Sequence, residues 1–362
     1  MRPAMLTLGF ETSCDETACA IVRDGRHVLS NAIATQTELH AGYGGVVPEI
    51  AGRAHVERLI PVLRRAVQDA GVSLSDIDAV AVGHRPGLIG SLLVGVSAAK
   101  AAALALGVPL VGVDHVQAHL VAGNLDADDD TPMPALGLVV SGGHTATYLV
   151  PELTRAQRLG STRDDAVGEA YDKAATILGL EYPGGPRLDA LAQDPAADPY
   201  AVEFPVSKLE EGSLDFSFSG LKTAVLYAVR GVPVRKGAPG PPPPPPLTED
   251  RVRDLAACFQ RAACHAVMLK VGRALDALAD SGVECRSILA GGGVTANSRL
   301  RKELTALAAE RGLVLRLPEM EYCLDNAAMI AALGGLRLMS GQHDDLTLRA
   351  HPSSDIPAFT AL

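Results

Sequence analysis

The stretch Leu6-Thr7-Leu8-Gly9-Phe10-Glu11-Thr12-Ser13-Cys14-Asp15-Glu16-Thr17 begins as an apolar strand and ends as a polar turn, and a second apolar strand follows at residues 18–22. The same order returns later, as a strand at residues 135–140, the turn Ser141-Gly142-Gly143-His144-Thr145 and a strand at residues 146–150. A supersecondary unit that recurs indicates two similar lobes. Single β-hairpins are common, however, so two unrelated hairpins remain the alternative.

The rest of the chain alternates between strand and helix patterns, which predicts an α/β fold. We expect further strands at residues 28–34, 79–82, 108–113, 287–290 and 314–317, and helices at 48–70, 88–106, 165–178, 250–281, 298–311 and 326–340. A Gly/Pro turn is expected at residues 182–186. The prolines at 241–246 mark a surface insertion at about residues 234–247, in polyproline II or loop conformation. We assign residues 1–130 plus about 325–362 to the N-terminal lobe and residues 131–324 to the C-terminal lobe.

The composition predicts large aliphatic cores, because 48% of the 362 residues are hydrophobic, 4% are aromatic and there is no Trp. The net charge of -10 argues against a broadly basic surface, so a nucleic acid would meet a local patch or one shared with other subunits. The 6 cysteines lack metal or disulfide spacing, and the chain begins without a signal-peptide pattern, which together indicate reduced thiols in a cytoplasmic protein. Lys100 and Pro109 interrupt the apolar residues 89–113, which we interpret as a buried helix and strand rather than a membrane span.

His115 and His119 follow a buried strand, with Asp114 at the position of a helix N-cap. Residues four apart share one face of a helix, so both imidazoles can point at one ion, although such pairs also occur by chance. A metalloprotease would carry Glu directly after the first histidine, where this chain has Val116. Asp325 is the candidate third ligand, and a plain helix cap is the alternative role for it. Two histidines and a carboxylate suit Fe(II) or Zn(II), and we expect one divalent metal, Fe(II) in preference to Zn(II).

Three small polar turns, at residues 11–17, 141–145 and 291–297, each follow the end of a strand. Backbone N–H groups in such turns can hold a phosphate, and glycine allows the ligand to come close. Any one of these turns alone is more often a plain connection. Two hairpin turns facing each other, with a third turn that opens a helix, predict a nucleotide site between two lobes.

The motifs of the chain resemble those of one known family, in order and over nearly the whole length. They are the stretch 11–17, Tyr43-Gly44-Gly45-Val46-Val47-Pro48-Glu49, His115-x-x-x-His119, the turn 141–145, Asp172-Lys173, Tyr182-Pro183-Gly184-Gly185-Pro186, Asp215-Phe216-Ser217-Phe218-Ser219-Gly220-Leu221-Lys222-Thr223, Gly292-Gly293-Val294-x-Ala296-Asn297 and Asp325-Asn326. This pattern is similar to the tRNA adenosine threonylcarbamoyltransferase family, TsaD, formerly described as O-sialoglycoprotein endopeptidase.

The resemblance implies an actin-like ATPase fold, as in sugar kinases, Hsp70 and actin, with two duplicated lobes and a nucleotide and metal cleft between them. It implies transfer of a threonylcarbamoyl group from threonylcarbamoyl-AMP to the exocyclic amine of the adenosine just 3′ of the anticodon in tRNA. The resemblance also implies accessory proteins as partners and no association with a membrane. The chemistry is expected to centre on the metal, and no residue is assigned as the catalytic base.

The resemblance also implies roles for particular residues. His115, His119 and Asp325 match metal ligands of the family. The positions that match its substrate-binding residues are Val139, Val140, Ser141, Gly142, Gly143, Asp172, Gly185, Asp189 and Asn297. Spacing alone favours solvated helix carboxylates for Asp172 and Asp189, and the motif match reverses that interpretation.

One departure concerns the loop Gly83-His84-Arg85-Pro86-Gly87-Leu88, where the family usually has Thr-x-Gly-Pro-Gly-Leu. Arg85 is expected to alter this strand-to-helix turn. Besides the transferase, a metalloprotease and an ATP-binding chaperone or sugar kinase of the same fold stand as alternatives. Basic residues in three groups are candidates for phosphate contacts with tRNA, or else are scattered solvated side chains: Arg53, Arg58, Arg64 and Arg65; Arg155, Arg158 and Arg163; Arg299, Arg301 and Lys302.

Overall fold

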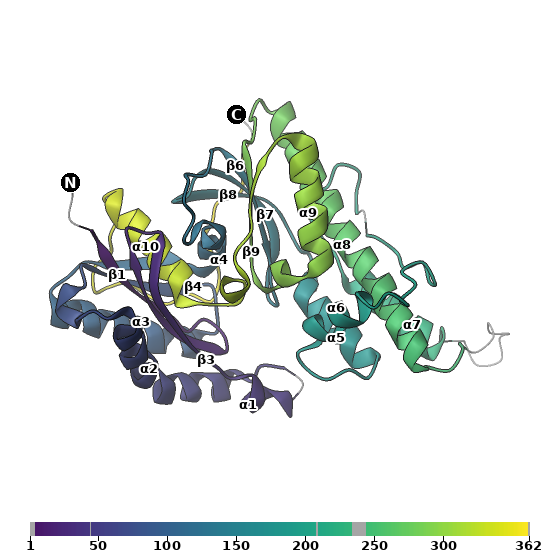
Figure 1. Cartoon of the computed structure of the whole chain (residues 1–362), viewed down its shortest axis with the longest axis horizontal. Helices are drawn as coiled ribbons and strands as arrows, with labels where there is room; N and C mark the ends of the chain where they lie inside the picture. The colour runs from purple at the N-terminus through teal and green to yellow at the C-terminus, as the bar shows by residue number, and fades with distance from the viewer. Residues whose placement is uncertain (1–3, 44, 208, 234–243, 361–362) are drawn as a thin grey trace.

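The computed structural model describes residues 4–43, 45–207, 209–233 and 244–360. The chain forms two five-stranded mixed sheets, each with helices packed against it (Figure 1). The first sheet contains β1 (Leu6–Glu11), β2 (Glu16–Arg23), β3 (His27–Thr35), β4 (Ala79–Arg85) and β5 (Leu110–Asp114). The second contains β6 (Ala135–Val140), β7 (Thr145–Glu152), β8 (Arg155–Ser161), β9 (Ser287–Gly291) and β10 (Val314–Arg316).

The two sheets have the same topology. The first runs β3-β2-β1-β4-β5, and the second, taken in the corresponding direction, runs β8-β7-β6-β9-β10. In each sheet the first three strands pair antiparallel, and the remaining pairings are parallel. The predicted repeat of strand, polar turn and strand is therefore the start of a duplicated lobe. We call the half of the molecule around β1–β5 the first lobe and the half around β6–β10 the second lobe.

Helices cover both faces of the first sheet. Phe10, Ile21 and Val82 face α2 (Pro48–Ala70) and α3 (Ile89–Leu106), whereas Ala20 and Ala81 face α10 (Ala327–Met339). This division follows from the alternation of side chains along each strand. The first lobe also carries α1 (Thr37–Ala41), α4 (His115–His119), η1 (Leu74–Asp76), η2 (Ala122–Asn124) and η4 (Met320–Tyr322).

The second sheet is also covered on both faces. On one face Leu136, Leu138 and Val140 join the largest core cluster together with the helices of the second lobe. These helices are α5 (Val167–Ile177), α6 (Gly184–Ala192), α7 (Ser219–Arg230), α8 (Glu249–Asp280) and α9 (Ser298–Arg311), the last preceded by η3 (Gly293–Ala296). On the other face Val139 packs with Val116 and Leu120, at either end of α4. The short helix with the two histidines therefore lies between the two lobes.

Most of the predicted elements are present, and several others were not predicted. The helix expected at 48–70 has those bounds, and the strand expected at 79–82 continues to residue 85. The sequence patterns did not predict β8 or α7. The turn expected at 182–186 is wrong in its second half, because α6 begins at residue 184. Pro186 is tolerated there because the first turn of a helix leaves its N–H groups unpaired. Of the insertion at 234–247, residues 234–243 lie outside the described residues.

One helix within the described residues is long and apolar enough to cross a membrane. It is α3, with a mean hydropathy of 1.8 over 18 residues, of which 33% are buried. The same helix packs on one side against β4 and α2, and β5 follows it after Pro109, so the expected helix and strand are present. The helix is not buried as expected, because its outer side is exposed. The six cysteines are all free.

Helix α10 lies so close to the first sheet that a small residue is required at the contact. A Cβ atom added to Gly334 would lie 2.3 Å from the Cβ atom of Ala81, far inside van der Waals contact. We expect Gly334→Ala to lower the free energy of unfolding by about 1–3 kcal/mol, the usual cost of overpacking a core. Urea denaturation followed by circular dichroism would measure the change.

Gly272→Ala is the matched control, because this glycine is also helical and a Cβ atom there would meet no atom within 4 Å. The control should leave stability unchanged or raise it by up to about 1 kcal/mol, since alanine is the better helix former. Equal destabilisation by both substitutions would contradict the packing argument.

Candidate metal and nucleotide site

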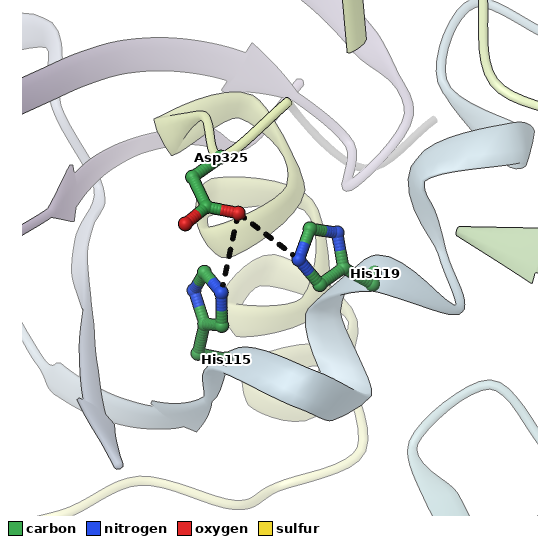
Figure 2. Close-up of side chains that lie close together, drawn as sticks. All are labelled: His115, His119 and Asp325. Atoms are coloured by element: carbon green, nitrogen blue, oxygen red, sulfur yellow. Dashed lines mark ion pairs between the residues drawn. The ribbon is translucent and has the colours of Figure 1, made fainter. Parts of the chain in front are cut away.

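A capped helical turn positions the two histidines. The carboxylate of Asp114, at the end of β5, accepts hydrogen bonds from the backbone N–H groups of Val116 (3.0 Å) and Gln117 (3.2 Å). This N-cap starts the five-residue helix α4, and the i,i+4 spacing directs both imidazoles to one side of it (Figure 2). Both side chains are buried, with His119 0% exposed.

Asp325 approaches the same point from the other end of the chain. Asn326, and not Asp325, caps α10, because the Asn326 side chain accepts the N–H of Met329 at 3.0 Å. The alternative role of Asp325 as a helix cap is therefore wrong. Its Oδ1 atom lies 3.4 Å from His115 Nε2 and 3.2 Å from His119 Nε2. Figure 2 shows one oxygen of Asp325 facing both imidazoles.

The three side chains fit a small divalent cation. Donor atoms that bind one metal at about 2.0–2.2 Å are separated from each other by about 3 to 3.5 Å, and the two distances above fall in this range. His119 Nε2 is buried without a hydrogen-bond partner among the described residues, despite its closeness to Asp325. The lone pairs of these side chains converge on one point without forming hydrogen bonds to each other, and a metal ion would bind such a set of lone pairs. One donor atom from each residue lies within 4.8 Å of the others.

A buried carboxylate orients the first of these histidines. Glu11, which is 0% exposed, contacts His115 Nδ1 at 3.0 Å through Oε2. Ser13 Oγ lies 3.2 Å from the same nitrogen. A hydrogen bond at Nδ1 leaves Nε2 to face Asp325, and metal-binding histidines are commonly oriented by such a bond at the other ring nitrogen. The motif match included Glu11, but no role was predicted for it.

Charge interactions shift the pKa values in this group. Burial lowers the pKa of His115, but the carboxylates of Glu11 and Asp325 outweigh it and hold the pKa well above its ordinary value. Burial raises the pKa of Asp325, but the charge of His115 and the close approach of both histidines bring the pKa well below its ordinary value. Burial, followed by His115 and His119, lowers the pKa of His144 to about 4. His144 is therefore neutral at pH 7.

Two glycine-containing turns meet next to the histidine helix. A Cβ atom on Gly291 would lie 2.0 Å from the carbonyl oxygen of His119, and one on Gly292 would lie 2.4 Å from that of Val140. Gly292 also has a φ angle of +94°, which favours glycine. The turn after β9 is thus pressed against both the end of β6 and the end of α4. This contact brings two of the three predicted turns together at the second lobe.

The predicted substrate-binding residues lie in three places. Val139 and Val140 end β6, and the turn Ser141–Gly142–Gly143 follows, with both glycines exposed. Asp172 Oδ1 accepts the N–H of Gly184 at 2.8 Å, next to Gly185. A solvated helix carboxylate is therefore the wrong description of Asp172.

Asp189 and Asn297 form the third group. Asn297 donates from Nδ2 to Asp189 Oδ1 at 3.1 Å and to Gln260 Oε1 at 2.8 Å, while Gln260 Nε2 donates to Asp189 Oδ1 at 2.9 Å. Ser298 adds a hydroxyl bond to Asp189 Oδ1 at 2.7 Å. Asp189 therefore ties α6 to the start of α9 and is not a plain solvated carboxylate. Gln260 was not predicted, because α8 carries no motif at that position.

The first turn faces the second lobe. Burial, then the carboxylates of Asp15 and Asp172, raise the pKa of Tyr182, so carboxylates of both lobes act on one phenol. Asp15 comes from the turn between β1 and β2, whereas Asp172 comes from α5. The sequence predicts a nucleotide site where hairpin turns of the two lobes face each other. The action of carboxylates from both lobes on Tyr182 is consistent with that prediction.

Comparison with known proteins gives these residues a context. Residues 27–332 match the sequence profile of TsaD, described as tRNA N6-adenosine threonylcarbamoyltransferase. The chain belongs to this family. Proteins with that name from Trichlorobacter lovleyi and Symbiobacterium thermophilum are each 49% identical over 347 residues, which is 96% of this chain and 95% and 96% of theirs. The resemblance drawn from the motifs is thereby confirmed.

Solved structures of other proteins share the fold. HypF of T. kodakarensis superposes with a TM-score of 0.58 at 16% identity, over 95% of this chain and 49% of that chain. Component A of (R)-2-hydroxyglutaryl-CoA dehydratase from Acidaminococcus fermentans gives 0.50 at 13% identity, over 92% of this chain and 99% of that one. At such identities the likeness shows the fold alone, and it confirms the two-lobed, actin-like α/β architecture.

Several of the arginines proposed for tRNA have structural partners instead. Arg58 donates to the Thr35 carbonyl at 2.6 Å, and Arg301 donates to the Thr295 carbonyl at 2.7 Å. The remaining members with ion pairs are Arg65 with Asp69, Arg163 with Asp215 and Arg299 with Glu303. These contacts favour structural roles for part of each group.

The site also predicts how stability depends on pH. Burial, then the charges of Asp325 and Asp15, raise the pKa of Glu16 from 4.5 to about 9. The folded state therefore binds this proton more tightly than the unfolded state, and stability is lost as the pH rises from 4.5 to 9. For protein treated with a chelator, Glu16→Gln should remove this loss. Thermal unfolding across that range should show an advantage of the variant that grows by at least about 1.4 kcal/mol, the equivalent of one pKa unit.

Glu310→Gln is the control, because Glu310 is exposed on α9. Its effect on unfolding should be small at every pH. An advantage of Glu16→Gln that stays constant from pH 4.5 to pH 9 would show that Glu16 ionises normally in the folded protein.

Proposed function

We propose that this protein transfers the threonylcarbamoyl group of threonylcarbamoyl-AMP to the exocyclic amine of the adenosine 3′ of the anticodon in tRNA. A new bond joins the amine nitrogen to the carbamoyl carbon, the bond from that carbon to the AMP phosphate oxygen breaks, and the amine loses one proton. The observation that carries the proposal is the convergence of two histidines and an aspartate beside glycine turns in a chain of this family.

In this proposal His115, His119 and Asp325 hold one divalent metal, Fe(II) in preference to Zn(II). The ion supplies Lewis-acid polarisation of the carbamoyl carbonyl when bound. Glu11 keeps His115 oriented through Nδ1, which lies 3.0 Å from its carboxylate. The carboxylates gathered here favour a cation at this point, since burial and the charges of Asp325 and Asp15 already raise the pKa of Glu16.

The second lobe would bind the nucleotide. Val139 and Val140 are buried at the end of β6 and would position the turn at residues 141–143, whose exposed Gly142 and Gly143 would offer backbone N–H groups to the phosphate. Asp172 with Gly185, and Asp189 with Asn297, would contact the nucleoside. Hydrogen bonds already fix the side chains of Asp189 and Asn297 in the unbound protein, so binding the nucleotide would cost little side-chain entropy.

We also propose that accessory proteins complete the tRNA site in the cytoplasm. The chain has a net charge of -10, and part of each arginine group is already paired, so tRNA binding by the chain alone should be weak. The exposed outer side of α2 and α3 carries Val56, Ile60 and Leu93, each more than half exposed. Such apolar side chains fit a protein partner better than a nucleic acid. The lobe boundaries proposed from the sequence, 1–130 plus about 325–362 and 131–324, belong to the same proposal.

The function is tested with reconstituted modification of tRNA. We expect His119→Ala and Asp325→Ala to abolish formation of threonylcarbamoyladenosine and to bind no stoichiometric metal, while the far-ultraviolet circular dichroism stays unchanged. The histidines lie on elements that already pack through Val116 and Leu120, so the fold should survive. His27→Ala, an exposed histidine, is the control. Full metal content together with full activity in the variants would contradict the assignment.

A second experiment separates the nucleotide from the metal. Asn297→Ala removes the amide that hydrogen-bonds Asp189 and Gln260, and should weaken binding of AMP or ATP at least about 10-fold, the equivalent of one hydrogen bond to a polar group. Metal content, measured by atomic absorption, should remain that of the unaltered protein. Unchanged nucleotide affinity in both Asn297→Ala and Asp172→Ala would remove the support for a nucleotide site in the second lobe.

A further inference from the structure

The segment that follows α10 returns along the edge of the first sheet. The Asp344 N–H donates to the Leu110 carbonyl at 2.8 Å, and the Gly112 N–H donates to Asp344 Oδ2 at 2.8 Å. Farther along, the His351 N–H donates to the His84 carbonyl at 2.9 Å. The segment therefore runs beside β5 and β4, the two strands that lead into α4 and into the unusual loop with Arg85.

Arg85 takes part in holding this segment. Its Nε–H donates to His84 Nε2 at 2.9 Å, and His84 Nδ1 donates to the Arg349 carbonyl at 2.8 Å. The Arg85 guanidinium also forms an ion pair with Asp355. Arg85, the departure from the usual family loop, thus contacts the C-terminal residues through Asp355.

Next to Asp355, the segment reaches the cap of the histidine helix. Ser354 Oγ donates to Asp114 Oδ2 at 2.6 Å. The other oxygen of the same carboxylate, Oδ1, accepts the N–H groups of Val116 and Gln117. Asp114 is only 5% exposed, so its second oxygen depends on a protein donor for its hydrogen bond. A continuous chain of contacts therefore joins Ser354 to the first turn of α4.

The segment then crosses to the second lobe. Ile356 packs against the cluster that contains Val116 and Leu120 of the α4 region. The Pro357 carbonyl accepts the Arg158 N–H at 2.7 Å, and the Phe359 N–H donates to the Arg158 carbonyl at 2.8 Å, at the edge of β8. One segment thus contacts the first sheet, the histidine helix and the second sheet.

We propose that residues 343–359 form a C-terminal strap that positions α4 between the lobes, with Ser354 and Arg85 as positioning residues. Ser354 fixes the Asp114 carboxylate in the orientation that caps α4, and Arg85 anchors the strap through Asp355. The strap thereby sets the direction of the His115 and His119 imidazoles without touching either of them. The structural part of this inference does not need the metal, whereas its consequence for metal binding rests on the proposed function.

Hydrogen–deuterium exchange of the intact protein tests the structural part. Ser354→Ala should speed exchange of the Val116 and Gln117 amides about 10-fold, because a loosened cap frees the N–H groups that it held. The amides of β6 should keep their rates. Ser353→Ala, which removes the neighbouring exposed hydroxyl, is the matched control and should change neither region. Unchanged rates at Val116 and Gln117, or equal acceleration in β6, would overturn the proposal.

Titration with Zn²⁺ tests the consequence. Ser354→Ala should weaken Zn²⁺ binding by about 10-fold, the lower end of the effect of changing residues that orient metal ligands. Asp355→Arg should weaken it similarly, because it places two cations together, and Arg85→Asp combined with Asp355→Arg should restore affinity. Loss of affinity that the charge exchange does not restore would exclude the Arg85 anchor. If the unaltered protein binds neither Zn²⁺ nor Fe²⁺, the proposed metal site fails, while the amide rates still decide whether the strap positions α4.

Discussion

The contact of one carboxylate with two histidines joins distant parts of the chain, and the rest of the site depends on it. Asp325 lies within 3.4 Å of His115 Nε2 and within 3.2 Å of His119 Nε2. The charges of Glu11 and Asp325 favour protonation of His115, and burial opposes it. Burial and the neighbouring carboxylates also keep Glu16 from ionising at its ordinary pH. A divalent cation at this point would lower the pKa values of both His115 and Glu16, because it attracts the carboxylates and binds imidazoles only in their neutral form.

The duplicated topology explains why the turns meet. In each lobe the first strand of the unit leads into a polar turn, and the parallel strand beside it ends on the same edge of the sheet. Loops at the carboxyl ends of parallel strands are the usual ligand sites in open α/β sheets. Because the lobe is duplicated, the molecule has two such sheet edges. Burial raises the pKa of Tyr182, and Asp15 of one lobe and Asp172 of the other raise it further, so charges from both edges act on one side chain.

The sequence predicts those parts of the site that depend on local patterns. The i,i+4 histidines, the cap by Asp114 and the bounds of α2 follow from spacing and capping within a few residues. The sequence did not distinguish Asp325 from Asn326 as the helix cap, because both side chains suit that position. Gln260 and Ser354 were not predicted, since their partners lie 71 and 240 residues away and no local pattern encodes such contacts. The strand β8 was missed because its apolar residues Ala156 and Leu159 are few and do not alternate. Helix α7 was missed although its apolar residues at 221, 224, 225, 228 and 229 recur at helical spacing.

Glycine connects the two chemical parts of the site. In the turn after β9, glycine is needed for packing before any ligand binds, because a Cβ atom on Gly291 would collide with the His119 carbonyl. The end of α4 is therefore pressed against the turn that opens toward Asn297, and η3 and α9 follow from it. Movement of the histidine helix must displace this turn, since packed interiors do not absorb shifts of an ångström without rearrangement. The geometry of the metal-binding group and that of the nucleotide turn are thus set by one contact, and neither can be adjusted without the other.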